Sequence, residues 1–204
     1  MNKYYLPVGI ILALTLLVIA TTVYPGGSQS NAGSVGFDWK DNYICNLFGP
    51  TAVNGAPNTA RYWAISGMFI LCATLAFFFA GFARKISQKS SARVIRFCGI
   101  AGMIAIFPVV TPLHDIAITV SFVLSMTAVV YIAIIVLASK LFYQKILACL
   151  TIISGYTAAY LYYTRTALWL LPTMQKISLV SVLVWFLALH FFTTKQDFIR
   201  PAKS

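Results

Sequence analysis

The chain has 204 residues, of which 60% are hydrophobic and only 9% charged, and its mean hydropathy is +0.84. About a quarter of the residues of a soluble domain are charged, so this composition excludes a protein that folds in water. The net charge of +11 does not indicate a nucleic-acid partner, because the Lys and Arg residues lie in short segments between long apolar runs, as they do in membrane proteins.

Six apolar runs are long enough to cross a bilayer, which needs about 20 residues per helix. The first run is also compatible with a signal peptide, since residues 18–20 resemble a cleavage site, but it is long for such a segment. Backbone groups in lipid must be paired internally, and runs of this length suit only helices. We therefore predict an all-α fold, a polytopic membrane helix bundle that forms one domain over residues 1–204. The predicted transmembrane helices cover residues 6–24, 61–82, 94–110, 116–139, 146–163 and 177–192.

The distribution of Lys and Arg predicts that both termini face the cytoplasm, because cytoplasmic loops carry the excess of basic residues. In that orientation eleven Lys and Arg residues lie inside and four outside, and the reverse orientation would invert the bias. We accordingly expect a multi-pass protein of a bacterial cytoplasmic membrane. The four outer basic residues are Lys40, Arg61, Arg165 and Lys176.

The longest connection, residues 25–60, lies on the predicted outer side, and loops of this length often carry function. Within it, residues 41–49 (DNYICNLFG) have the pattern of a short amphipathic helix capped by Asp41. The polar side of this helix faces either the water above the membrane or a pocket above the bundle. That side carries Asn42, Cys45 and Asn46.

The residues just before the second helix add polar candidates for a ligand site, Asn54 and Asn58. Asn58 is also placed to cap this helix. Arg61 is expected in its first turn, where a positive charge opposes the helix dipole. The Arg61 side chain either reaches the phospholipid headgroups or helps to hold an anion.

His114 and Asp115 are adjacent in the short connection before the fourth helix, at the predicted outer rim. Asp115 could simply cap that helix, and His114 could be an interfacial histidine without a further task. Together they could polarise a water or a hydroxyl group, with Cys45 as the nucleophile. No metal or cofactor is expected, because His190 is predicted at the opposite face, glutamate is absent and the four cysteines lack metal-type spacing.

The predicted outer face favours an anion, because the second, fourth and sixth helices begin there with their positive dipole ends. This geometry is generic to six-helix proteins of this orientation, but Arg61, Arg165 and Lys176 add positive charge to it. The predicted helix interiors contain no Asp, Glu, Lys or Arg, which argues against an ion-coupled transporter.

Two segments carry a resemblance to a known family. Residues 39–49 (WKDNYICNLFG), which follow the first helix, and Phe107-Pro108 shortly before His114-Asp115 resemble the two markers of the six-helix DUF998 family. That family is related to the damage-regulated autophagy modulators and a GPI-anchor lipid-remodelling factor. The resemblance implies a six-helix bundle with a lipid-related role in some relatives. The chain departs from the Ser-Asp of many members, because Cys45 and Asn46 stand there, and Phe48 is inserted.

We therefore expect a membrane protein that binds or organises a lipid or another amphiphile at its outer face. Two alternatives stay open: a membrane-embedded hydrolase or acyltransferase that uses His114, Asp115 and Cys45, and a structural subunit of a membrane complex. The expected partner is membrane lipid, and self-association is left open. The candidate ligand-binding residues are Asn42, Asn46, Asn54, Asn58, Arg61 and Arg165.

Overall fold

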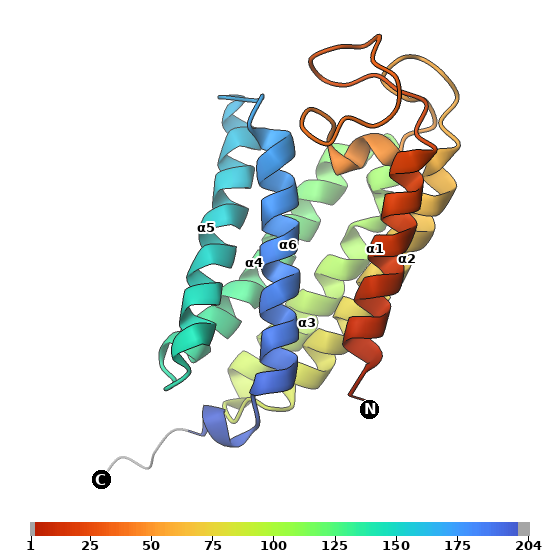
Figure 1. The fold of residues 1–204 in the computed structure, drawn as a ribbon. Helices are drawn as coiled ribbons and strands as arrows, with labels where there is room; N and C mark the ends of the chain where they lie inside the picture. The colour runs from red at the N-terminus through yellow and green to blue at the C-terminus, as the bar shows by residue number, and fades with distance from the viewer. Residues whose placement is uncertain (1–2, 200–204) are drawn as a thin grey trace. The chain divides into compact units, whose positions relative to one another are not determined.

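The computed structural model describes residues 3–199 and contains six long helices joined by irregular segments (Figure 1). No β-strand occurs in this described part of the chain, which has only two isolated bridges, so the predicted all-α fold is confirmed. The long helices are α1 (Tyr5–Thr22), α2 (Ala60–Ala83), α3 (Lys89–Ala105), α4 (His114–Leu137), α5 (Phe142–Thr164) and α6 (Leu171–Phe192). Three short 3₁₀ helices are η1 (Ile44–Leu47), η2 (Phe107–Val110) and η3 (Gln196–Phe198).

Each of the six segments has the length and composition of a membrane span. Five are single helices of 18 to 24 residues, and the third, Lys89–Val110, combines α3 with η2. Pro108 explains the break, because proline lacks the N–H that an α-helix would require at this point. The chain therefore has the fold of a multi-pass membrane protein, as its composition predicts.

Three helices begin four to six residues earlier than the apolar runs predict. α3 begins at Lys89 instead of residue 94, α5 at Phe142 instead of residue 146, and α6 at Leu171 instead of residue 177. Pro172 is tolerated in the first turn of α6, where its missing N–H would have no helical partner anyway. Lys176, which interrupts the apolar run, donates from Nζ to the Pro172 carbonyl oxygen at 2.9 Å, so its charge is compatible with the helix.

The chain forms two compact units. The α3–α4 unit comprises the described parts of Met1–Pro7, Cys72–Ile152 and Leu183–Ser204, and the loop unit comprises Val8–Leu71 and Ile153–Val182. α1, α2, α5 and α6 contribute residues to both units, whereas α3 and α4 belong wholly to the first.

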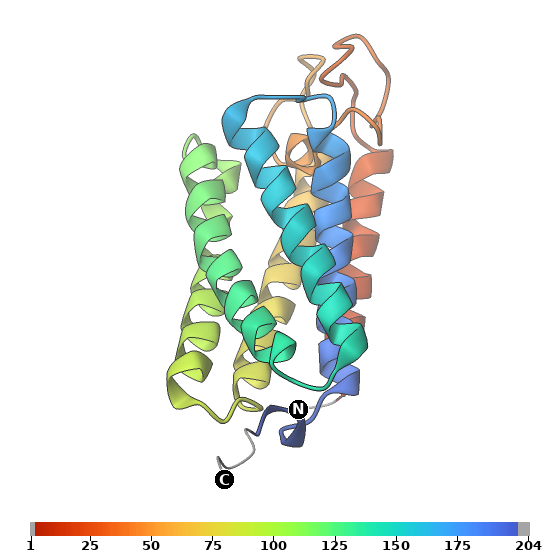
Figure 2. The ribbon, with the colours of Figure 1, turned by 90° about the vertical axis from the view of Figure 1, so that its left-hand side faces the viewer.

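The α3–α4 unit is held together by an aromatic core and by close helix packing. Phe78 stacks on Phe186 with ring centroids 4.3 Å apart, and Phe79 meets Phe186 edge-on at 5.3 Å. α3 and α4 lie side by side (Figure 2), and the Ser121 hydroxyl on α4 donates to the Gly102 carbonyl oxygen on α3 at 2.9 Å. Such close approach requires small residues on α3.

Candidate functional site

Asn42 is the central anchor of the loop between α1 and α2. Its side chain is fully buried, its Nδ2 donates to the Gly27 carbonyl oxygen at 2.8 Å, and its Oδ1 accepts from the Asp38 N–H at 2.8 Å. A buried amide satisfied in this way holds backbone in place. The structure therefore gives Asn42 a role in fastening the loop.

The predicted helix over residues 41–49 is wrong, because only the single 3₁₀ turn η1 forms there. Asp38 Oδ1 accepts from the N–H groups of Lys40 and Asp41 at 2.8 and 3.3 Å. Asn46 Oδ1 accepts from the Tyr43 N–H at 2.7 Å. Short polar side chains that bind nearby N–H groups compete with the helical pattern, which explains why the helix does not extend.

Asn58 joins η1 to the segment before α2. Its Nδ2 lies 2.9 Å from the carbonyl oxygen of Gly49 and 3.2 Å from those of Asn46 and Leu47, and the side chain is buried. The predicted helix cap is wrong, because Asn58 Oδ1 is buried and accepts no hydrogen bond from residues 3–199. Asn58 therefore holds η1, and its Oδ1 is an available acceptor.

Two α6 side chains bind the same loop. Gln175 Oε1 accepts from the Ile44 N–H at 2.8 Å, and its Nε2 lies 3.5 Å from the Cys45 Sγ. Lys176 Nζ donates to the Asn42 carbonyl oxygen at 2.7 Å. These contacts could not be predicted from the sequence, because Gln175 belongs to no recognisable motif and lies about 130 residues from its partners.

Arg61 lies in the first turn of α2, as predicted, and its side chain is half-buried. Its Nε is buried and has no hydrogen-bond partner among residues 3–199. The positive charge also faces the positive end of the helix dipole. A buried donor of a charged group is costly to leave unpaired, so the site favours a negatively charged acceptor.

Arg165 and Asn54 are the more exposed candidates of the loop unit. The Arg165 guanidinium lies 5.1 Å from the centroid of the Tyr162 ring, and its backbone has a positive φ of 58°. Burial raises the pKa of the Tyr43 hydroxyl, and the positive charge of Arg165 acts in the opposite direction. Asn54 Oδ1 accepts from the Ala56 N–H at 3.0 Å, which closes a turn of the loop.

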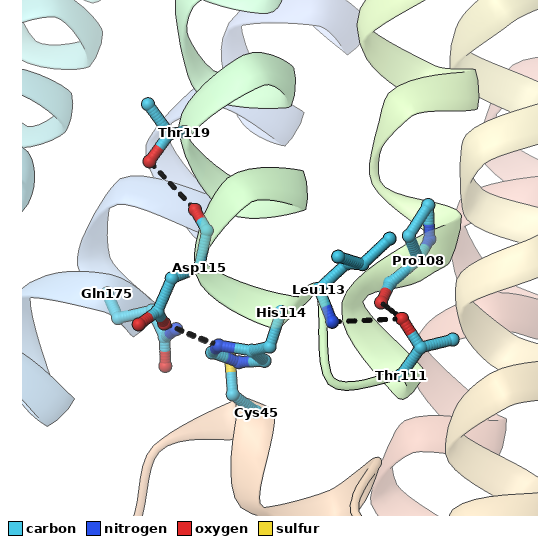
Figure 3. A network of polar contacts seen from close by, with 8 residues as sticks. All are labelled: Cys45, Pro108, Thr111, Leu113, His114, Asp115, Thr119 and Gln175. Atoms are coloured by element: carbon cyan, nitrogen blue, oxygen red, sulfur yellow. Dashed lines mark hydrogen bonds and ion pairs between the residues drawn. The ribbon is translucent and has the colours of Figure 1, made fainter.

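His114 and Asp115 form the first turn of α4, in the α3–α4 unit. Figure 3 shows the imidazole and the carboxylate turned toward each other, and His114 Nδ1 lies 2.9 Å from Asp115 Oδ1. The predicted Asp115 cap is wrong, because the helix already begins at His114 and Leu113 occupies the cap position. A carboxylate in the first turn still interacts favourably with the helix dipole.

Thr111 shapes the connection that presents this pair. Its hydroxyl donates to the Pro108 carbonyl oxygen at 2.7 Å and accepts from the Leu113 N–H at 3.2 Å (Figure 3). Side-chain bonds of this kind stabilise tight turns. The side-chain hydrogen bonds of Thr111 therefore stabilise the conformation of the connection between η2 and α4.

Cys45, the proposed nucleophile, is a half-buried free thiol in η1 of the loop unit. Within residues 3–199, no three His, Cys, Asp or Glu side chains are grouped closely enough to hold a metal ion.

Comparison of the chain with protein-family models, with curated proteins and with solved structures found no match.

Proposed function

We propose that this protein binds the anionic headgroup of a membrane lipid or a similar amphiphile, with Arg61 as the principal contact. The observation that carries the proposal is the buried, unpartnered Nε of Arg61 in the first turn of α2. A phosphate or carboxylate at this position would pair with the guanidinium and would also face the N–H groups of the first helical turn.

The surrounding loop supports this proposal by its rigidity. Asn42 and Asn58 tie the loop together through buried hydrogen bonds, and Lys176 fastens it to α6. Prior ordering of a site lowers the entropy lost when a ligand binds. Asn42 and Asn46 thus support the ligand site as positioning residues, while Asn54, Asn58 Oδ1 and Arg165 are the proposed further contacts.

The excess of Lys and Arg on one side supports an extracytoplasmic position of this loop in a bacterial cytoplasmic membrane. The resemblance of residues 39–49 and of Phe107-Pro108 to DUF998 proteins supports membership of that group and a lipid-related role. The extracytoplasmic position of the loop and the membership of the DUF998 group are both part of the same proposal.

Native mass spectrometry of the detergent-purified protein tests the proposal. We expect a co-purifying anionic lipid whose occupancy falls about tenfold or more in Arg61→Ala, because hydrogen bonds to charged groups contribute about 1.5–3 kcal/mol. Arg61→Lys should retain intermediate occupancy, since lysine keeps the charge but loses the planar fork. Lys40→Ala, which removes an exposed charge from the same loop, is the matched control. Lipid-free wild-type protein, or equal occupancy in all variants, would contradict the proposal.

A second candidate function is acyl transfer or hydrolysis, favoured by the contact between His114 and Asp115. In that reaction Asp115 orients the imidazole and His114 takes a proton from a water molecule, whose oxygen attacks the acyl carbon while the bond to the leaving group breaks. Incubation with a thioester acyl donor should then release the free thiol, and His114→Ala should abolish this release. Wild-type protein that releases no thiol would rule this candidate out.

A further inference from the structure

A second concave site lies in the α3–α4 unit, around the C-terminal ends of α2 and α6. It is a pocket of about 410 Å³, within the range of known ligand sites. Four basic side chains contribute to its lining and no acidic side chain does. The lining residues with a basic group are Lys3, Arg84, Lys85 and His190.

Buried aromatic side chains form an apolar part of the lining of this pocket. Phe78 and Phe82 line it, and both rings are almost completely buried. The two rings stack with centroids 5.7 Å apart, and Phe82 also meets Phe198 edge-on at 5.5 Å. Phe191, which is 45% exposed, forms an apolar wall. The pocket therefore combines a charged lining with surface that suits a hydrocarbon chain.

Two of the basic side chains are already used to build the pocket. Lys85 Nζ donates to the carbonyl oxygens of Leu189, His190 and Thr193 at 3.2, 3.3 and 2.7 Å. His190 Nε2 lies 2.9 Å from the Lys3 carbonyl oxygen, which can only accept, so this nitrogen carries the proton. These bonds fix the end of α6 and hold Lys3 beside it.

Lys3 and Arg84 are the two exposed basic side chains of the lining. Lys3 Nζ lies 4.9 Å from the centroid of the Tyr4 ring, and neither side chain forms an ion pair within residues 3–199. Asp197 acts electrostatically on Lys85 but does not line the pocket. No acidic side chain of the lining therefore neutralises the positive charge of Lys3 and Arg84.

We propose that this pocket binds a phosphate group, carried either by an anionic phospholipid or by a small soluble phosphate ester. Basic pockets between transmembrane helices recognise anionic headgroups in this way. The site is separate from that around Arg61, which lies in the first turn of α2, whereas Arg84 follows the last residue of the same 24-residue helix.

The test compares the wild-type protein with the double variant Lys3→Gln/Arg84→Gln. In nanodiscs titrated with phosphatidylglycerol, native mass spectrometry should show lipid binding weakened about 30-fold by loss of two charges. Phosphatidylcholine binding should not change. The control Lys140→Gln/Lys145→Gln removes the same charge from residues that do not line the pocket, and should bind phosphatidylglycerol like the wild type.

A calorimetric titration with glycerol phosphate distinguishes the two ligand sources. Saturable binding that the double variant loses, without a preference for phosphatidylglycerol, assigns the pocket to a soluble phosphate ester. If neither probe distinguishes the double variant from the control pair, the proposal is overturned. Thermal unfolding verifies that the variants fold. The single variant Lys3→Gln, at an exposed position, repeats the binding comparison with the loss of only one charge. Because Arg61 is unchanged throughout, the result is independent of the function proposed above.

Discussion

At the scale of single residues, the polar side chains of the loop unit divide into those that build the loop and those that remain for a ligand. Asn42 and Lys176 complete hydrogen bonds to backbone groups far away in the sequence. Arg61 is the contrasting case, because its buried Nε has no such partner among residues 3–199. Whether a polar side chain builds the loop or is left for a ligand depends on which backbone groups lie close to it in the fold. No local pattern in the sequence predicts this.

Asn58→Ala should destabilise the protein more than Asn54→Ala does. Asn58 Nδ2 serves three carbonyl oxygens of η1 and its neighbours and is buried, whereas Asn54 is exposed. Buried polar groups left without partners cost about 1–3 kcal/mol. The melting temperatures of the two variants in one detergent check this expectation. Equal melting temperatures would show that the Asn58 contacts contribute little.

At the scale of the elements, hydrophobic run length predicts the six helices well but their ends less well. A run of about 20 apolar residues has no other stable state in lipid, so the existence of each helix follows directly. The predicted start of α6 is too late because Lys176 interrupts the apolar run, although its amine is satisfied by carbonyl oxygens. The helix predicted over residues 41–49 failed because side chains such as Asp38 and Asn46 bind local N–H groups instead.

Gly99→Ala should disturb the packing of α3 strongly. A Cβ atom at Gly99 would lie 2.2 Å from Cγ of Phe79, a buried ring that has little room to move. Overpacking of this kind costs about 1–3 kcal/mol. Ala101→Val is the control, since it adds more volume on the same helix at a shallow, open groove. Thermal unfolding should rank Gly99→Ala as the less stable variant, and the opposite order would contradict the packing described for α3.

The stability of the turn at η3 should depend on pH, because Asp197 accepts hydrogen bonds more strongly as a carboxylate than as a neutral acid. Hydrogen bonds from the N–H and hydroxyl of Thr194 lower the pKa of the Asp197 carboxyl below its usual value of 3.8. A lowered carboxyl pKa means that the stabilisation is complete above pH 3.8 and is lost as the pH falls through the folded-state pKa. Hydrogen exchange of the Thr194 amide, corrected for its intrinsic pH dependence, should show this loss. Asp197→Asn should show no such transition, and a transition of the same size in that variant would exclude Asp197 as its cause.

At the scale of the whole molecule, composition and the six apolar segments together establish a multi-pass membrane protein. The candidate sites were only partly predictable. Arg61 and the His114–Asp115 pair stand out in the sequence as polar residues at the ends of apolar runs. The pocket around Lys3 and Arg84 was not recognisable, because its residues come from three distant parts of the chain.

We propose that the loop between α1 and α2, with Arg61 beside it, faces the outside of the cytoplasmic membrane. Substituted-cysteine labelling of intact cells tests it most directly, using a variant without native cysteines that carries either Gln29→Cys in this loop or Gln88→Cys between α2 and α3, both exposed positions. A membrane-impermeant maleimide should label Gln29→Cys in intact cells and Gln88→Cys only after the membrane is opened. Labelling of Gln88→Cys but not Gln29→Cys in intact cells would contradict the proposed orientation and move the Arg61 site to the cytoplasmic face.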